Sequence, residues 1–165
     1  MQQAAETSAP GLRFIAWSRI WSPLVPEDLR REAWDALELP GSWQELETEF
    51  WSTFQLGVPA PPVPLLLHAA LGIAGDAARE DWMRVMVHLG LRWDGRHLQP
   101  DHLGPACEIL ACAIEAEEHV LVGELCSRYL LGWCEVARTK LAETGSQLTS
   151  LAERFERDLR ALVAG

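Results

Sequence analysis

The sequence predicts an all-α fold, a single-domain helical bundle of about seven to eight helices. Apolar residues recur three and four positions apart along most of the chain, which is typical of amphipathic helices. No stretch of four or more residues alternates apolar and polar positions with the β-branched and aromatic bias of a strand. At 165 residues, 48% hydrophobic and 23% charged, the chain has the size and composition of one globular domain. We expect residues 1–11 to be a flexible N-terminus and residues 12–165 to form that domain.

Three amphipathic helices are predicted in the first third of the chain, over residues 12–21, 26–37 and 42–54. Pro26 suits the first turn of the second helix, because the N–H that proline lacks would have no partner there. Ser42 and Glu45 form a capping-box pattern, S-x-x-E, that begins the third helix.

Five further helices are predicted after an irregular, stiff, proline-rich loop at residues 57–64. They cover residues 64–74, 77–91, 102–118, 119–143 and 148–162. The first of these is apolar on nearly every side, so we expect it to be deeply buried and to end at Gly75. Gly145 fits the position just after a helix, where a left-handed backbone conformation favours glycine.

The charge of the chain bears on its partners and its location. A formal charge of −10, from 24 acidic and 14 basic residues, makes nucleic acid a poor partner and favours a cationic one. The longest apolar run, about residues 63–71, is far shorter than the roughly 18 to 20 residues of a membrane span, so no stable membrane insertion is expected. The pair Arg30 and Arg31 precedes acidic residues instead of an apolar stretch and is not an export signal. We expect a cytoplasmic protein.

The sequence shows no glycine-rich phosphate loop, no H-E-x-x-H pair and no nucleophile elbow. The five histidines are scattered, and no two share a predicted helix at a spacing of three or four. The four cysteines are Cys107, Cys112, Cys126 and Cys134. Their spacing matches no zinc motif, and the acidic run Glu115, Glu117 and Glu118 is typical of a solvated face. We predict no catalysis, no metal and no cofactor; a small all-α enzyme with an unrecognised site is the alternative.

Tryptophan is unusually frequent, with eight in 165 residues. Trp17, Trp43 and Trp133 lie on regular apolar stripes, which favours a place in the core. Trp51 and Trp93 lie off a stripe or in a loop, so core packing and a binding surface are both open for them.

One short segment, residues 99–104 with the sequence Q-P-D-H-L-G, precedes a long predicted helix. Pro100 keeps the chain extended, and Asp101 is a good N-cap. His102 has no such explanation, because a histidine is better placed near the negative C-terminal end of a helix. The segment resembles the P-D-H signature of the TorD/DmsD/NarJ family of chaperones, which help mature molybdenum-containing oxidoreductases.

Three other stretches agree with this family in order and spacing. Residues 49–54, E-F-W-S-T-F, followed by Gly57 and Pro59, are similar to the aromatic helix end and the Gly/Pro-rich loop before the family's central helices. Residues 108–110 resemble the acidic and apolar continuation of the signature. Residues 128–141 are similar to the helix that the family carries near its C-terminus.

The resemblance covers about residues 49–142 and implies a TorD-like cytoplasmic chaperone. Such a protein holds the N-terminal region or twin-arginine signal peptide of an oxidoreductase catalytic subunit precursor until the molybdenum cofactor is inserted. The chain departs from the family in its short N-terminal part and in the apolar run P-L-L-L-H-A-A-L, residues 64–71, which leaves the width and polarity of the groove open. A NarJ-like assembly factor for a non-exported subunit is the alternative. Helix exchange between family protomers makes the loop 93–100 a candidate hinge for a homodimer.

The peptide-binding site that the resemblance implies joins an acidic group to an apolar surface, because arginines pair with carboxylates beside an apolar, helix-forming stretch. The residues expected to form it are Phe50, Trp51, Phe54, Gly57, Pro59, Trp93, Pro100, Asp101 and His102. In this hypothesis Asp101 supplies the carboxylate, the aromatic residues line the apolar part, and His102 helps to shape the site. None of these residues is expected to be a catalyst.

Overall fold

The computed structural model describes residues 8–94 and 98–165, and within them the fold is all-α, as predicted. The elements are α1 (Ala9–Trp21), α2 (Glu27–Ala36), α3 (Trp43–Phe54), α4 (Leu67–Leu71), α5 (Gly75–His88), α6 (Leu103–Glu115), α7 (His119–Leu125), a π-helical turn η1 (Cys126–Leu130), α8 (Leu131–Thr144) and α9 (Thr149–Ala164). Because α7, η1 and α8 join end to end, these ten elements form eight helical rods in the described part of the chain. No described helix is both long enough and apolar enough to cross a membrane.

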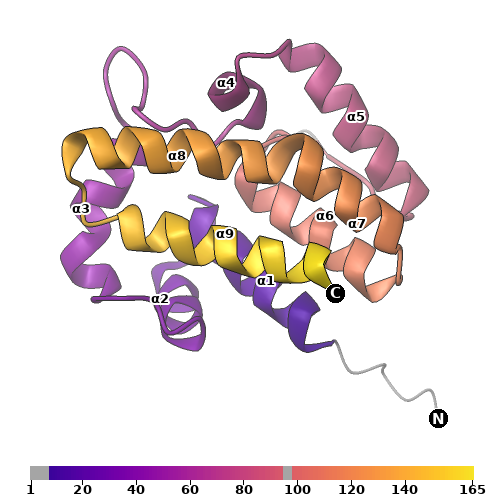
Figure 1. Cartoon of the computed structure of the whole chain (residues 1–165), viewed down its shortest axis with the longest axis horizontal. Helices are drawn as coiled ribbons and strands as arrows, with labels where there is room; N and C mark the ends of the chain where they lie inside the picture. The colour runs from indigo at the N-terminus through magenta and orange to yellow at the C-terminus, as the bar shows by residue number, and fades with distance from the viewer. Residues whose placement is uncertain (1–7, 95–97) are drawn as a thin grey trace.

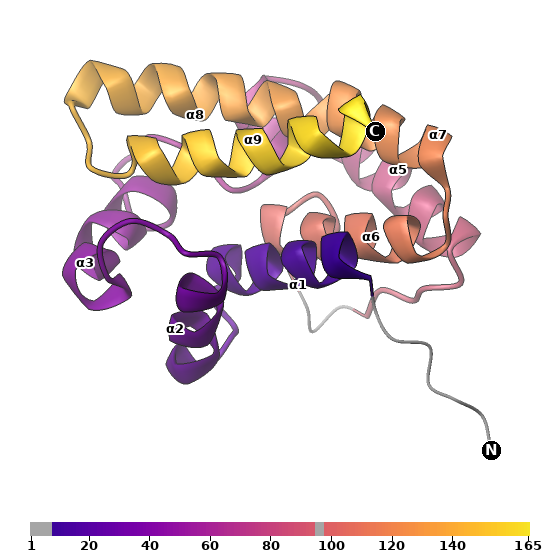
Figure 2. The ribbon, with the colours of Figure 1, turned by 60° about the horizontal axis from the view of Figure 1, so that its bottom comes forward.

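Two pairs of helices form the body of the bundle (Figures 1 and 2). α8 and α9 lie side by side in one layer, and α1 and α6 pack together in the other (Figure 2). α1 and α6 run antiparallel, since Gly11 in α1 lies against Glu115 of α6, while Gly104 in α6 lies against Ser22 just after α1. A Cβ atom at Gly104 would lie only 3.2 Å from Cβ of Ser22, so glycine permits this close approach.

The N-terminal boundary of the first helix differs from the prediction. The side chain of Ser8 accepts a hydrogen bond from the Gly11 N–H at 3.2 Å, and Pro10 occupies the first turn, so α1 begins at Ala9. The helix therefore begins three residues before the predicted start at residue 12, while residues 1–7 lie outside the described residues.

Two helix ends that the sequence predicted are confirmed. The Ser42 hydroxyl accepts a hydrogen bond from the Glu45 N–H at 3.3 Å and begins α3. Gly145, with a φ of 63°, ends α8 in the left-handed conformation.

The segment predicted as a long buried helix, residues 64–74, is mostly not helical. Val63, Leu65 and Leu67 are buried while the residues between them are half-buried, and Leu66 forms an isolated antiparallel bridge with His102. Only α4, a helix of five residues, follows this extended stretch. The helix ends at Gly72, which has a φ of 66°, and Gly75 begins α5 instead of ending its predecessor.

The core is built around aromatic side chains. All four phenylalanines and six of the eight tryptophans belong to one chain of ring contacts. Trp17, Trp43 and Trp133 are buried, which confirms their predicted place in the core. Phe155 of α9 packs on rings from both α1 and α8, so this cluster joins the two layers.

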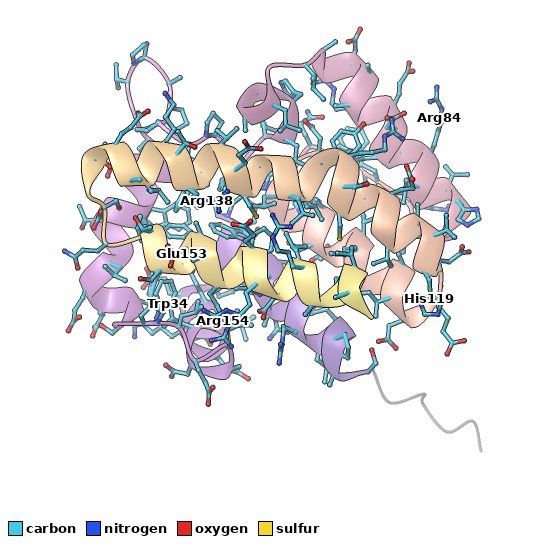
Figure 3. All side chains as sticks on the ribbon, viewed as in Figure 1. Trp34, Arg84, His119, Arg138, Glu153 and Arg154 are labelled. Atoms are coloured by element: carbon cyan, nitrogen blue, oxygen red, sulfur yellow. The ribbon has the colours of Figure 1, made fainter. Side chains whose placement is uncertain are left out.

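Two buried acids on α9 fasten that helix to its neighbours. Asp158 accepts a hydrogen bond from Trp17 Nε1 at 2.9 Å and pairs with Arg13 of α1 at 3.3 Å. Glu156 pairs with Arg160 at 2.8 Å and with Arg138 of α8 at 3.6 Å (Arg138 is labelled in Figure 3). These acids have structural partners, so they do not form an acidic binding surface.

Candidate functional site

The carboxylate of Asp101 lies inside the protein. Its Oδ2 accepts a hydrogen bond from the His68 N–H at 3.2 Å and lies 2.5 Å from His68 Nδ1. The Asp101 carbonyl accepts from the Leu67 N–H at 2.9 Å, so both groups hold the start of α4. The side chain is fully buried. This corrects the expectation that Asp101 presents a carboxylate to a partner's arginine.

His102, and not Asp101, is the N-cap of α6. Its Nδ1 accepts a hydrogen bond from the Gly104 N–H at 3.0 Å, which a histidine can do only when that nitrogen carries no proton. Burial lowers the pKa of His102 to about 4, so the ring is neutral at physiological pH. A neutral histidine avoids the repulsion between an imidazolium and the positive end of the helix, which supplies the missing reason for this residue.

The aromatic residues predicted from α3 do not share a surface. Phe50 and Phe54 are buried in the core, where they have no surface to offer a peptide, which corrects their expected role. Trp51 is half-buried, and the guanidinium of Arg30 lies 4.9 Å from its ring centroid. Arg30 thus already occupies the face of Trp51 that a cationic ligand would use.

The remaining predicted residues are dispersed. Gly57 and Pro59 lie in the loop between α3 and α4, where Pro59 is exposed, and Pro100 is buried beside Asp101. Trp93 is half-buried, and its Nε1 donates to the Leu98 carbonyl at 2.9 Å. Of the candidate hinge 93–100, residues 95–97 lie outside the described residues. The nine predicted residues therefore do not come together in one site.

Trp93 alone among them lines an open groove that runs along α6. Its first part, of about 400 Å³, lies between the connection from α1 to α2, the end of α5 and the first turns of α6. Its apolar walls include Leu24, Val25, Met86, Leu91, Trp93 and Ile109. A second part, of about 550 Å³, shares Leu91, Glu108 and Cys112 with the first and continues to Glu115. We call the two parts together the α6 groove.

The charges around the α6 groove are mostly negative. Glu108 and Glu115 are exposed on α6, and Pro26, another lining residue, leads directly into Glu27 and Asp28 in the first turn of α2. Arg92 is a basic residue that lines the first part. An apolar groove edged by carboxylates attracts a ligand that is both apolar and cationic.

Sequence reasoning missed most of this groove because several of its wall residues lie just after the ends of helices. Leu24 lies between two predicted helices, and Leu91 follows α5 although the predicted helix 77–91 included it, so periodicity did not mark either as a groove residue. Glu108 was noticed only as part of a motif. As the one charged residue in the apolar run 103–114, it could have marked α6 as one wall of a binding surface.

Two titratable groups outside the groove, Cys107 and Tyr129, are held in their protonated forms. Burial raises the pKa of the Cys107 thiol well above its usual value. Burial also raises the pKa of Tyr129, whose hydroxyl donates a hydrogen bond to Asp81, to about 12. These groups are therefore protonated and poor nucleophiles at neutral pH. Across the described residues, no three His, Cys, Asp or Glu side chains gather with a geometry that could hold a metal ion.

Comparisons of the chain with models of protein families, with curated proteins and with solved structures found no match. The resemblance to the TorD/DmsD/NarJ family therefore rests on the residue patterns described above. What the structure adds is the bundle and the α6 groove, and the function is argued from these.

Proposed function

We propose that the protein is a cytoplasmic chaperone for a molybdenum-containing oxidoreductase. It binds the N-terminal region or twin-arginine signal peptide of the catalytic subunit during cofactor insertion, before export or assembly. The observation that carries this proposal is the α6 groove, an open apolar surface edged by carboxylates. The groove lies along the helix that the P-D-H segment begins.

The chemistry of such a peptide suits the groove. A twin-arginine signal peptide places two guanidinium groups before an apolar stretch that becomes helical in an apolar groove. The apolar stretch would contact Leu24, Leu91 and Trp93, where a half-buried tryptophan offers a rigid anchor. One of the two neighbouring arginines would lie near the carboxylates of Glu108 and Glu115, which are exposed.

In this proposal the P-D-H residues act as positioning residues and do not touch the peptide. Asp101 fastens the start of α4, and His102 caps α6, so together they fix the helix that forms one side of the groove. A change at either residue would alter peptide binding only through the shape of the groove. The signature would then be structural, although it marks the functional helix.

The test is a calorimetric titration with the signal peptide of an adjacent oxidoreductase gene, beside a peptide in which both arginines are replaced. We expect micromolar or tighter binding, about −8 kcal/mol or more favourable, that weakens when the arginines are lost. Leu24→Ser should weaken binding without affecting folding, because Leu24 is 60% exposed. Val163→Ser is the matched control, since Val163 is 46% exposed on α9 and lies outside the groove.

Two outcomes would count against the proposal in different ways. Equal binding of the two peptides would favour the NarJ-like alternative, an assembly factor for a non-exported subunit. Absence of binding to both, or equal effects of Leu24→Ser and Val163→Ser, would contradict the chaperone function at this groove.

A further inference from the structure

The side of α6 that faces the groove carries a regular pattern of residues. Pro105, Glu108, Cys112 and Glu115 follow one another at steps of three, four and three, which places them on one stripe of the helix. Pro105 and Cys112 are half-buried, whereas Glu108 and Glu115 are exposed. The two carboxylates are seven residues apart, which is two helical turns or about 10 Å along the axis.

We propose that the α6 groove selects a helical segment of a partner protein that carries two basic residues seven positions apart, one for Glu108 and one for Glu115. This inference rests on the proposed function for the use of the groove as a peptide site. It adds a rule for which peptide is preferred, namely the spacing of its basic residues.

The geometry of helices carries the spacing. Two side chains seven positions apart on a helix point in nearly the same direction and are about 10 Å apart, which matches the two carboxylates. Adjacent side chains point about 100° apart, so a helix with two neighbouring arginines can turn only one of them toward α6. Apolar residues three and four positions from each basic residue would then face Val25 and Leu91.

The contacts of Glu115 and the position of Arg92 are consistent with this arrangement. Ser8 donates to Glu115 through its N–H, at 2.9 Å, and through its hydroxyl, and both bonds end on Oε1. These neutral donors leave the charge of Glu115 in place. Arg92 lines the part of the groove beside Trp93 but not the part that reaches Glu115. It therefore opposes a basic residue of the ligand at the Trp93 end. Among the described residues that line the part reaching Glu115, the charged ones are therefore both acidic.

The experiment compares two synthetic amphipathic peptides of about 18 residues with the same composition. One carries its two arginines seven positions apart and the other carries them side by side, and each is titrated into the full-length protein. We expect the first to bind about tenfold more tightly. Glu108→Gln and Glu115→Gln should each weaken its binding by about threefold, and the double variant by about tenfold.

Two further variants separate local from general charge effects. Glu153→Gln changes the net charge equally at an exposed position of α9 outside the groove, and should leave binding unchanged (Figure 3). Arg92→Gln should tighten binding of the first peptide about threefold, without disturbing the contact between Ser8 and Glu115. Equal binding of the two peptides, or an effect of Glu153→Gln equal to that of Glu108→Gln, would overturn the inference.

Adding the natural twin-arginine peptide to the same series separates this inference from the proposed function. If the peptide with spaced arginines binds and the signal peptide does not, the inference stands and the signal-peptide function fails. If the signal peptide binds and the spacing of arginines has no effect, the chaperone proposal stands and the inference is overturned.

Discussion

His102 caps α6 with a ring nitrogen, and this links the first turn of the helix to pH. The folded protein keeps the ring neutral down to about pH 4, because burial lowers the pKa. An exposed histidine in the unfolded chain takes up a proton near pH 6.5. As the pH falls, the unfolded state therefore gains this proton first, and the folded state loses stability.

We predict that the free energy of unfolding falls as the pH is lowered from about 6.5 to 4, with His102 contributing about 3 kcal/mol of the loss. His102→Asn retains a capping acceptor that does not titrate, so its stability should depend less on pH in this range. Urea unfolding of both proteins at several pH values measures the difference. Parallel pH profiles for the two proteins would show that His102 is not the group responsible.

The buried carboxylate of Asp101 should matter for stability more than for binding. Asp101→Ala removes the acceptor for the His68 N–H and is expected to cost about 2 kcal/mol, whereas Asp101→Asn keeps one acceptor oxygen and should cost less. Denaturant unfolding gives both values. At a temperature where each variant is folded, peptide affinity should change little. A large loss of affinity in a stable Asp101→Asn protein would mean that the carboxylate contacts the ligand.

Single residues were the hardest to place from the sequence. The segment around Asp101 was correctly identified as a helix start, because Pro100 and Asp101 carry strong local signals. His102 caps α6 in place of Asp101 because the Asp101 carboxylate contacts His68. His68 lies 33 positions before Asp101, and nothing in the local sequence indicates this contact. Local propensity identifies a helix start, but the tertiary partners decide which side chain caps it.

At the scale of elements, Gly145 ends α8 with a φ of 63°, which is a conformation that side chains with a Cβ atom adopt at a cost. We predict that Gly145→Ala lowers the free energy of unfolding by about 1 kcal/mol. Gly123→Ala is the opposite control, because Gly123 lies within α7 and a Cβ atom there meets nothing within 4 Å. That change should stabilise the protein by up to about 1 kcal/mol. Thermal unfolding of both variants measures the two effects. Equal shifts of the melting temperature in the two variants would contradict the argument.

Helices with a polar face were predicted well, and the exceptions have a common cause. The boundaries of α3 and α9 follow from their spacing of apolar residues and agree with the structure to within two residues. Residues 63–67 alternate in burial, but the residues between the buried ones are Pro64 and Leu66, which are also apolar, so a uniformly apolar sequence hides the alternation. The π-helical turn η1 interrupts a helix whose sequence periodicity gives no sign of it.

At the scale of the whole molecule, Phe155 connects the layers of the bundle. Its ring lies 4.9 Å from that of Trp17 and 5.9 Å from that of Trp133, measured between centroids. We predict that Phe155→Ala costs about 3 to 5 kcal/mol of unfolding free energy, because it leaves a cavity between α1, α8 and α9. Val163→Ala, at an exposed position of the same helix, should cost almost nothing. A loss below about 1 kcal/mol for Phe155→Ala would mean that the core closes around the gap.

The fold could be predicted more fully than the site because the two depend on different information. Core residues recur three and four positions apart in the sequence, and Trp17, Trp43 and Trp133 were placed correctly on that basis. The α6 groove is formed where the ends of α1 and α5 meet α6. It therefore depends on how these helices pack together and not on the sequence of any one helix. Trp93 is the one predicted site residue that lines it.

The unequal burial of the cysteines has a practical consequence for labelling chemistry. Cys107, Cys126 and Cys134 are buried, whereas Cys112 is half-buried where the two parts of the α6 groove meet. A thiol-reactive fluorophore should therefore attach at one position in the native protein and at four after unfolding. Partial burial raises the pKa of Cys112, so labelling should be faster at alkaline pH. A peptide seated in the groove would slow this reaction, and the emission of a dye already attached would report the arrival of a ligand in real time.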